Sequence, residues 1–286
     1  MQPGKPRVWT VFSAYALVIV LALGLGPIVV AVGLIVLDPQ GLAQAAGRPG
    51  PASIARLQEL MQRPGLVVAA AAINALVLLV VALSAAALSP EPVRERLRFT
   101  RPKIPPVAIT LAAVAFFALS SAFDGLLALV GLEDTGSLGF LARAVQGATG
   151  GALALLVLAV GAGAGVAEEL FFRGYVQKRL VARWGPRAGV AVTAVLFGLI
   201  HFDLLHSAFA LVGGLYLGWI AERAGSVWPS AVAHTLNNAA WTLGVALLPR
   251  VRGASVGGAV LLLGLIVGVI STWKLVRTLE ASTQRS

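Results

Sequence analysis

Long apolar segments with almost no charge recur along the whole chain and limit what it can fold into. A helix that crosses the hydrocarbon core of a bilayer needs about 20 mostly apolar residues. Charged residues make up only 12% of the sequence and its mean hydropathy is +0.88, whereas soluble domains carry about a quarter charged residues. We therefore expect an all-α, polytopic integral membrane protein.

About eight segments are predicted to cross the bilayer and to surround a central helical bundle. They are residues 10–37, 66–88, 107–132, 147–175, 188–201, 207–220, 227–248 and 256–276. The fifth and sixth are short and are expected to be tilted or partial spans around a cavity. The first is longer than the about 7–15 apolar residues of a signal peptide, so we expect it to remain as a helix. Residues 53–62 are expected to form a short amphipathic helix on the outer surface.

The distribution of charge predicts the orientation. Most of the 22 lysines and arginines fall between apolar segments, on the side that also holds the N-terminus. This pattern predicts a multi-pass protein of the inner (cytoplasmic) membrane with both termini in the cytoplasm. We interpret the net charge of +10 as a topology signal and as contacts to the lipid bilayer, so no nucleic-acid partner is expected.

No internal repeat is apparent, so we expect one membrane unit in three parts. Residues 1–106 hold the first two spans and a basic cytoplasmic loop. Residues 107–250 hold a core with the polar motifs between residues 168 and 238. Residues 251–286 hold the last span and a cytoplasmic tail.

Three charges interrupt or adjoin the fourth apolar segment: Glu168, Glu169 and Arg173. An ionisable side chain within a bilayer is costly and by default indicates a functional site. Residues four apart share a helix face, so Glu169 and Arg173 are expected to pair, while Glu168 points elsewhere and faces a cavity. A poorly solvated free carboxylate suits a general base. The alternative interpretation is that both glutamates merely cap and pair at the cytoplasmic end of a helix.

Two further motifs lie on later apolar segments. His201 ends the fifth segment, and His234 and Asn238 share a helix face within the seventh. An isolated His/Asn pair can simply hold membrane helices together. At 1.5 Å per residue, however, these three residues and Glu168 fall within about 12 Å of one another in depth. We therefore expect them to meet in one buried aqueous pocket. His206, in an expected loop, is not assigned to it.

These residues allow two ways to activate a water molecule. Glu168 with His201 can hold and deprotonate it, while His234 and Asn238 donate hydrogen bonds to the oxyanion that forms when it attacks a peptide carbonyl. Alternatively, Glu168, His201 and His234 bind Zn²⁺, which activates the water. The zincin signature HExxH is absent, and zero cysteines exclude a Cys-ligated metal. An aspartyl protease needs two aspartates, and Asp124, the one clearly intramembrane aspartate, has no obvious second aspartate as its partner.

The motifs Glu168-Glu169-xxx-Arg173, Phe197-xxx-His201 and His234-xxx-Asn238 resemble, in this order, the three motifs of the CPBP family. This family is also called ABI or CAAX-protease-like and includes the type II CAAX prenyl endopeptidases. The resemblance covers residues 145–245. It implies an intramembrane peptidase acting on a membrane-anchored protein or peptide, which is lipidated or carries a C-terminal sorting signal.

The resemblance also implies roles for single residues. Glu168 and His201 activate water, His234 and Asn238 stabilise the oxyanion, and Glu169 and Arg173 support the site. Family members are described both as metalloproteases and as metal-free, so no cofactor is certain and Zn²⁺ stays open.

Two alternative functions remain. In a proton-coupled transporter, Glu168 and the histidines would form a relay, but carriers often show repeats and interrupted helices, which we do not find clearly. A non-catalytic immunity or scaffold protein could use the same fold, although the intact motifs do not favour loss of activity.

Overall fold

The computed structural model describes residues 7–47, 50–248 and 250–284, and every regular element in these ranges is a helix. The elements are α1 (Trp9–Leu37), α2 (Pro39–Gly47), α3 (Pro51–Met61), α4 (Pro64–Ala87), α5 (Val93–Arg96), α6 (Pro106–Leu129), α7 (Gly136–Val145), α8 (Gly150–Leu156), η1 (Val157–Ala164), α9 (Gly165–Glu169), η2 (Leu170–Gln177), α10 (Lys178–Trp184), α11 (Pro186–Leu199), α12 (Leu204–Ala224), α13 (Trp228–Leu247) and α14 (Ala254–Thr283). The predicted all-α fold is confirmed.

Six of the helical segments described are long and apolar enough to cross a membrane, which makes this a multi-pass membrane protein. They are α1, α4, α6, the continuous run from α8 to α10, α12 and α14. All eight predicted segments are helical, but the count of eight spans is approximate. Helix α11 has only 14 residues, and α13 carries several polar side chains among its 20 residues.

The prediction that the sixth segment is short is wrong. Helix α12 is 21 residues long because Asp203 caps it, its side chain accepting a hydrogen bond from the backbone N–H of His206. The helix therefore begins at Leu204, earlier than expected, and it ends before Gly225, whose φ of +58° places it in the left-handed region. The expected loop at His206 is thus the first turn of this helix.

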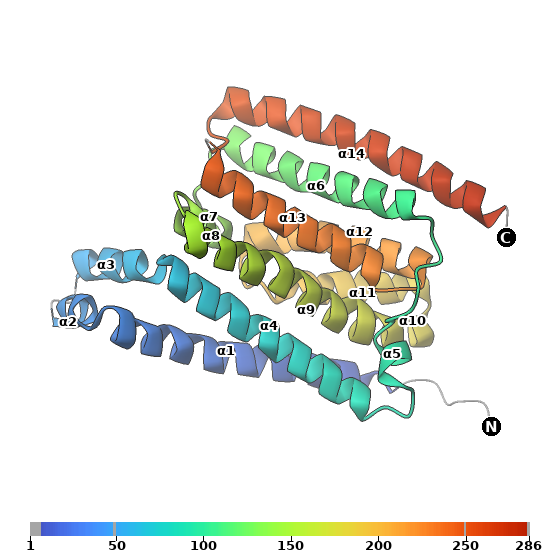
Figure 1. Cartoon of the computed structure of the whole chain (residues 1–286), viewed down its shortest axis with the longest axis horizontal. Helices are drawn as coiled ribbons and strands as arrows, with labels where there is room; N and C mark the ends of the chain where they lie inside the picture. Colours follow the sequence, from blue (N-terminus) through green and yellow to red (C-terminus); the bar gives the residue numbers. More distant parts are fainter. Residues whose placement is uncertain (1–6, 48–49, 249, 285–286) are drawn as a thin grey trace.

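The long helices run side by side and form a layered bundle (Figure 1). Helix α14 packs on α6, α6 on α13, and α13 on the η1–α9 segment, while α4 covers the other side of that segment and α1 packs on α4. Helices α11 and α12 pack against each other and lie behind this series in the view of Figure 1. The segment with the two glutamates is therefore central in the bundle.

Large apolar side chains cover the outside of the outermost helices. On α1, Val20 and Ile28 are exposed, and on α14 Leu262 and Val269 are exposed. Contiguous apolar surface of this kind is rare on soluble monomers. It is the expected surface of helices whose solvent is lipid.

The predicted amphipathic helix at residues 53–62 is present as α3. Its Leu60 is buried against Leu34 and Leu66, and nearby Arg63 pairs with Asp38 at 2.6 Å. The position of α3 on the outer surface, the orientation of the termini and the three-part division stay predictions. Three of the cations behind the predicted orientation lie outside the described residues: Lys5, Arg48 and Arg285.

Candidate functional site

Glu168 lies within one continuous helical segment that runs from Gly150 to Trp184. Two wide, π-helical stretches, η1 and η2, flank the short helix α9 that ends with Glu168 and Glu169. Such stretches are rare and frequently occur at functional sites. The predicted end of this segment at residue 175 is wrong: the helix continues until Gly185, whose φ is +83°.

Helix α13 approaches the glutamate segment closely because glycines line the contact. Gly161 and Gly165 are four residues apart, and they face the backbone of Ala239 and Thr235. A Cβ atom at position 165 would lie 2.8 Å from Thr235 Oγ1 and 3.0 Å from Thr235 Cα. Small residues at this spacing are typical of close helix packing in membranes. The close approach at these two glycines brings His234 next to the glutamates.

We expect Gly165→Ala to destabilise the protein by about 1–3 kcal/mol, because the added methyl group pushes α13 away from α9. Thermal unfolding in detergent measures this effect. Gly151→Ala, in the same helical segment but with no atom within 4 Å of the added carbon, is the matched control. There the substitution should be neutral or stabilising, since alanine has the higher helix propensity. Equal melting temperatures for both variants would contradict the proposed close packing.

Glu169 and Arg173 form an ion pair in the interior. Arg173 Nη1 lies 2.8 Å from Glu169 Oε1, and both side chains are 0% exposed. Arg173 Nη2 also donates to the carbonyl of Gly214 at 3.3 Å, and the guanidinium lies 4.4 Å from the ring centroid of Phe197. The pairing expected from helical spacing is thus present, and it connects the glutamate segment to α11 and α12.

His234 lies between the two glutamates. Its Nδ1 is 3.0 Å from Glu169 Oε1, and its Nε2 is 3.7 Å from Glu168 Oε2. Since an ionised carboxylate only accepts, Nδ1–H donates to Glu169. The rings of Phe116 and Phe197 meet the imidazole edge-on, with centroids 6.0 and 5.9 Å away. His234 is therefore fixed from three sides, with Nε2 directed toward Glu168.

His201 follows the last turn of α11, and its ring orientation is set by its own motif. Its Nδ1 lies 2.8 Å from the carbonyl oxygen of Phe197, four residues earlier. A carbonyl can only accept, so Nδ1 carries the proton, and in the neutral ring Nε2 is left as the basic nitrogen. The spacing of the Phe-xxx-His motif thus selects one tautomer.

One cavity of about 430 Å³ collects the predicted catalytic residues. Its lining includes Glu168, His201, His234 and Asn238, whereas Glu169 and Arg173 are not among the residues that line it. The two adjacent glutamates therefore have different surroundings: the Glu168 side chain is 19% exposed and Glu169 is fully buried. Asn238 donates to the carbonyl of Val160 at 3.3 Å, and its second amide hydrogen has no acceptor among the described residues.

The sequence interpretation gave no role to three residues of this site, although Phe197 is part of the second motif. His206 is in the first turn of α12, not in a loop, and it lines the cavity with its ring centroid 4.0 Å from that of His201. Asn237 is buried, lines the cavity and donates to Asn238 Oδ1 at 3.3 Å. Phe197 contacts Arg173, His201 and His234. The Asp203 cap was the signal that could have placed His206 on a helix.

The zinc alternative does not fit the arrangement of donor groups. Across residues 7–47, 50–248 and 250–284, no three His, Asp or Glu side chains are placed to hold one metal ion, and this includes Glu168, His201 and His234. We therefore derive no step of the chemistry through a metal.

The fold and site together define a polytopic membrane protein with a carboxylate, imidazoles and a carboxamide around one cavity inside an apolar helical bundle. Comparison with protein families agrees with this description: residues 150–240 match the family described as type II CAAX prenyl endopeptidase Rce1-like. The predicted resemblance to the CAAX-protease-like family is confirmed for the part of the chain that holds the three motifs. The family supports a CAAX-type intramembrane protease in general. No curated protein and no solved structure matches the chain.

Proposed function

We propose that this protein is an intramembrane endopeptidase that uses Glu168 to activate water and cleaves a membrane-associated protein, lipidated or with a C-terminal sorting signal. One observation carries the proposal: Glu168, His201, His234 and Asn238 line one cavity, while the neighbouring Glu169 is held by Arg173 outside it. A purely structural pair of glutamates would not require this division.

In the proposed first step, water occupies the cavity beside Glu168 and His201. The Glu168 carboxylate takes a proton from the water, whose oxygen attacks the carbonyl carbon of the peptide bond. The free Nε2 of His201 accepts a second hydrogen bond from the same water and orients it. The products of this step are a tetrahedral oxyanion and a protonated Glu168.

In the second step, His234 and Asn238 stabilise the oxyanion. The unused hydrogen of the Asn238 amide is one donor. His234 can donate from Nε2 only when its ring carries both protons, and we propose that it does so between the two carboxylates. Once Glu168 has taken the proton from water, its negative charge no longer attracts the Nε2–H, which then donates to the oxyanion. Glu168 then passes its proton to the departing amine as the C–N bond breaks.

The surroundings of the cavity match a substrate that arrives in the bilayer. Its lining is mainly apolar and reaches α1, α3 and α4 through residues such as Val30, Met61 and Leu78. A lipid-attached or hydrophobic peptide could therefore lie along the same cavity that holds the polar groups. We propose the inner membrane as the location, with both termini in the cytoplasm, on the charge distribution.

The direct test offers farnesylated and unmodified membrane-anchored peptides to the purified full-length protein in detergent and in liposomes. We expect endoproteolytic products in mass spectra, and one ¹⁸O atom in the new carboxyl group in H₂¹⁸O. His201→Ala should lower kcat by about 10²-fold, within the range for general acid–base groups, with the protein still folded.

Three results would contradict the proposal. Peptides that stay intact while liposomes show proton-coupled uptake would favour the transporter. Tight peptide binding without cleavage would favour an immunity or scaffold role. Activity that disappears with EDTA and returns with zinc would contradict the steps above, which use only side chains of the chain.

A further inference from the structure

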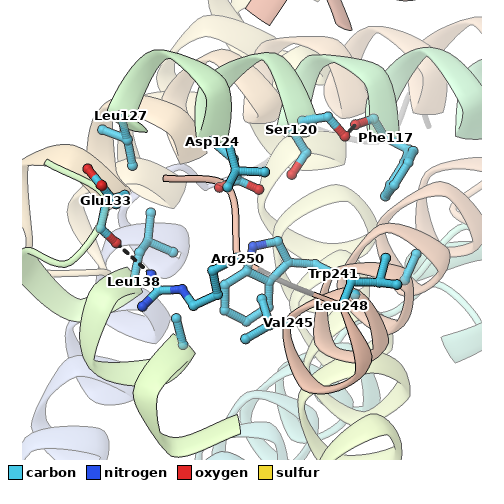
Figure 2. Close-up of a pocket in the computed structure, with 15 residues that line it drawn as sticks. Phe117, Ser120, Asp124, Leu127, Glu133, Leu138, Trp241, Val245, Leu248 and Arg250 are labelled. Carbon is cyan, nitrogen blue, oxygen red and sulfur yellow. Dashed lines mark hydrogen bonds between the residues drawn. The ribbon is translucent and has the colours of Figure 1, made fainter. Parts of the chain in front are cut away.

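A second, smaller cavity lies beside the catalytic one (Figure 2). Its volume is about 190 Å³, and it lies between α6, α7, α13 and the segment that contains Arg250. Ser120, Asp124, Leu138 and Trp241 line both cavities. We call this space the side chamber, because its shared wall makes it an extension of the catalytic cavity.

Asp124 is the polar centre of the shared wall. It is on the membrane-spanning helix α6, and its carboxylate faces the indole of Trp241 (Figure 2). Among the described residues, it has no cation within ion-pair distance. An intramembrane carboxylate is costly and normally has a partner. The proposed steps of hydrolysis do not use Asp124.

A second carboxylate, Glu133, lines the other end of the side chamber. Its Oε2 atom is buried and has no hydrogen-bond partner among the described residues. The nearby Arg250 does not neutralise it, since the Arg250 side chain pairs with Asp134 at 2.5 Å. Arg250 also donates to the backbone carbonyl of Glu133 at 2.8 Å (Figure 2). Arg252 also pairs with Asp134, at 3.3 Å.

The charges in and around the side chamber therefore favour a cation. Arg250, which lines the chamber, and Arg252 both form their ion pairs with Asp134, and Arg143 donates to the backbone carbonyl of Asp134. Among the described residues, Asp124 and Glu133 therefore keep no ion partner. A cationic nitrogen in the side chamber would meet two carboxylates that lack an ion partner, away from bulk water, where charge-assisted hydrogen bonds are strongest.

We propose that the side chamber is a specificity subsite that receives a basic side chain, lysine or arginine, of the peptide substrate. The inference rests on the proposed peptidase function. Trp241 follows His234 by seven residues on α13, which is about 10 Å along the helix. An extended peptide covers this distance in about three residues. The subsite thus selects a basic residue about three positions from the cleaved bond.

The test uses membrane-anchored peptides in which one lysine is moved through the five positions on each side of the cleaved bond, with norleucine as the neutral replacement. For the wild-type protein we expect kcat/KM to be about tenfold higher for lysine near the third position on one side. In Asp124→Asn, which keeps an acceptor for Trp241, the ratio of lysine to norleucine should fall toward one. Glu133→Gln should lower the ratio partly.

Glu280→Gln is the matched control, because Glu280 is exposed on α14 and lines neither cavity; its lysine ratio should equal that of the wild type. Cleavage with no lysine preference at any position, or a preference that survives both Asp124→Asn and Glu133→Gln, would overturn the subsite. A peptide with a free N-terminal ammonium and no lysine shows whether the side chamber takes an amino terminus instead of a basic side chain.

A separate binding measurement keeps the subsite testable if no peptide is cleaved. The same peptides, labelled with a fluorophore, are bound to Glu168→Gln and to Glu168→Gln/Asp124→Asn, and anisotropy gives Kd. Tighter binding of the lysine peptide that is lost in the double variant would support the subsite while the peptidase proposal fails. Equal Kd values for lysine and norleucine peptides would overturn the subsite itself.

Discussion

Glu168→Gln is expected to lower the rate of peptide hydrolysis by a factor of about 10²–10⁴, the contribution usual for a general acid–base group, while the protein stays folded. Glutamine has the same shape but cannot take the proton of the attacking water. The side chain borders the cavity and has no ion pair with arginine or lysine among the described residues. The measurement is kcat at saturating substrate, together with thermal unfolding of the same preparation.

The adjacent glutamate supplies the matched control for this variant. Glu169→Gln makes the same chemical change one residue away, but at a fully buried side chain that pairs with Arg173 and accepts from His234. We expect it to lower the melting temperature first, since it leaves the Arg173 charge without its partner. If Glu168→Gln retained activity while Glu169→Gln lost activity without destabilisation, the assignment of the two glutamates would have to be exchanged.

The different surroundings of the two glutamates could be predicted from the sequence because they follow from helix geometry. Residues 169 and 173 share a face in any helical turn, and an unpaired arginine in lipid would be costly. The meeting of His201, His234 and Asn238 near Glu168 was also accessible, since position along a span gives an approximate depth. Both arguments need only spacing, so they hold although wide helical turns flank the glutamates.

Contacts between helices could not be predicted in the same way. Spacing says nothing about the rotation of α13 against α9, which places His234 Nδ1 on Glu169 and Nε2 near Glu168. That rotation depends on glycines such as Gly165, whose missing side chain gives no signal in a hydropathy pattern. The position of Asp124 beside a second cavity likewise depends on the packing of α6 against α13.

Arg173→Met is expected to destabilise the protein more than Glu169→Gln or Gly165→Ala, by about 3–5 kcal/mol, because it strands a fully buried carboxylate. Methionine can occupy much of the arginine volume beside Phe197, so the loss reports charge more than packing. The measurement is thermal unfolding and folded yield in detergent. Arg187→Met, at an exposed position on α11, is the control and should change the melting temperature little.

The double variant Glu169→Gln/Arg173→Met decides why the arginine is needed. If Arg173 serves to neutralise Glu169, removing both charges should restore much of the stability lost in Arg173→Met, and the double-mutant cycle should give a large interaction energy. Full additivity would instead mean that the contacts of Arg173 with the Gly214 carbonyl and the Phe197 ring carry its role. A stable but inactive double variant would show further that Glu169 must be charged to hold His234, which connects the buried ion pair to catalysis through one hydrogen bond.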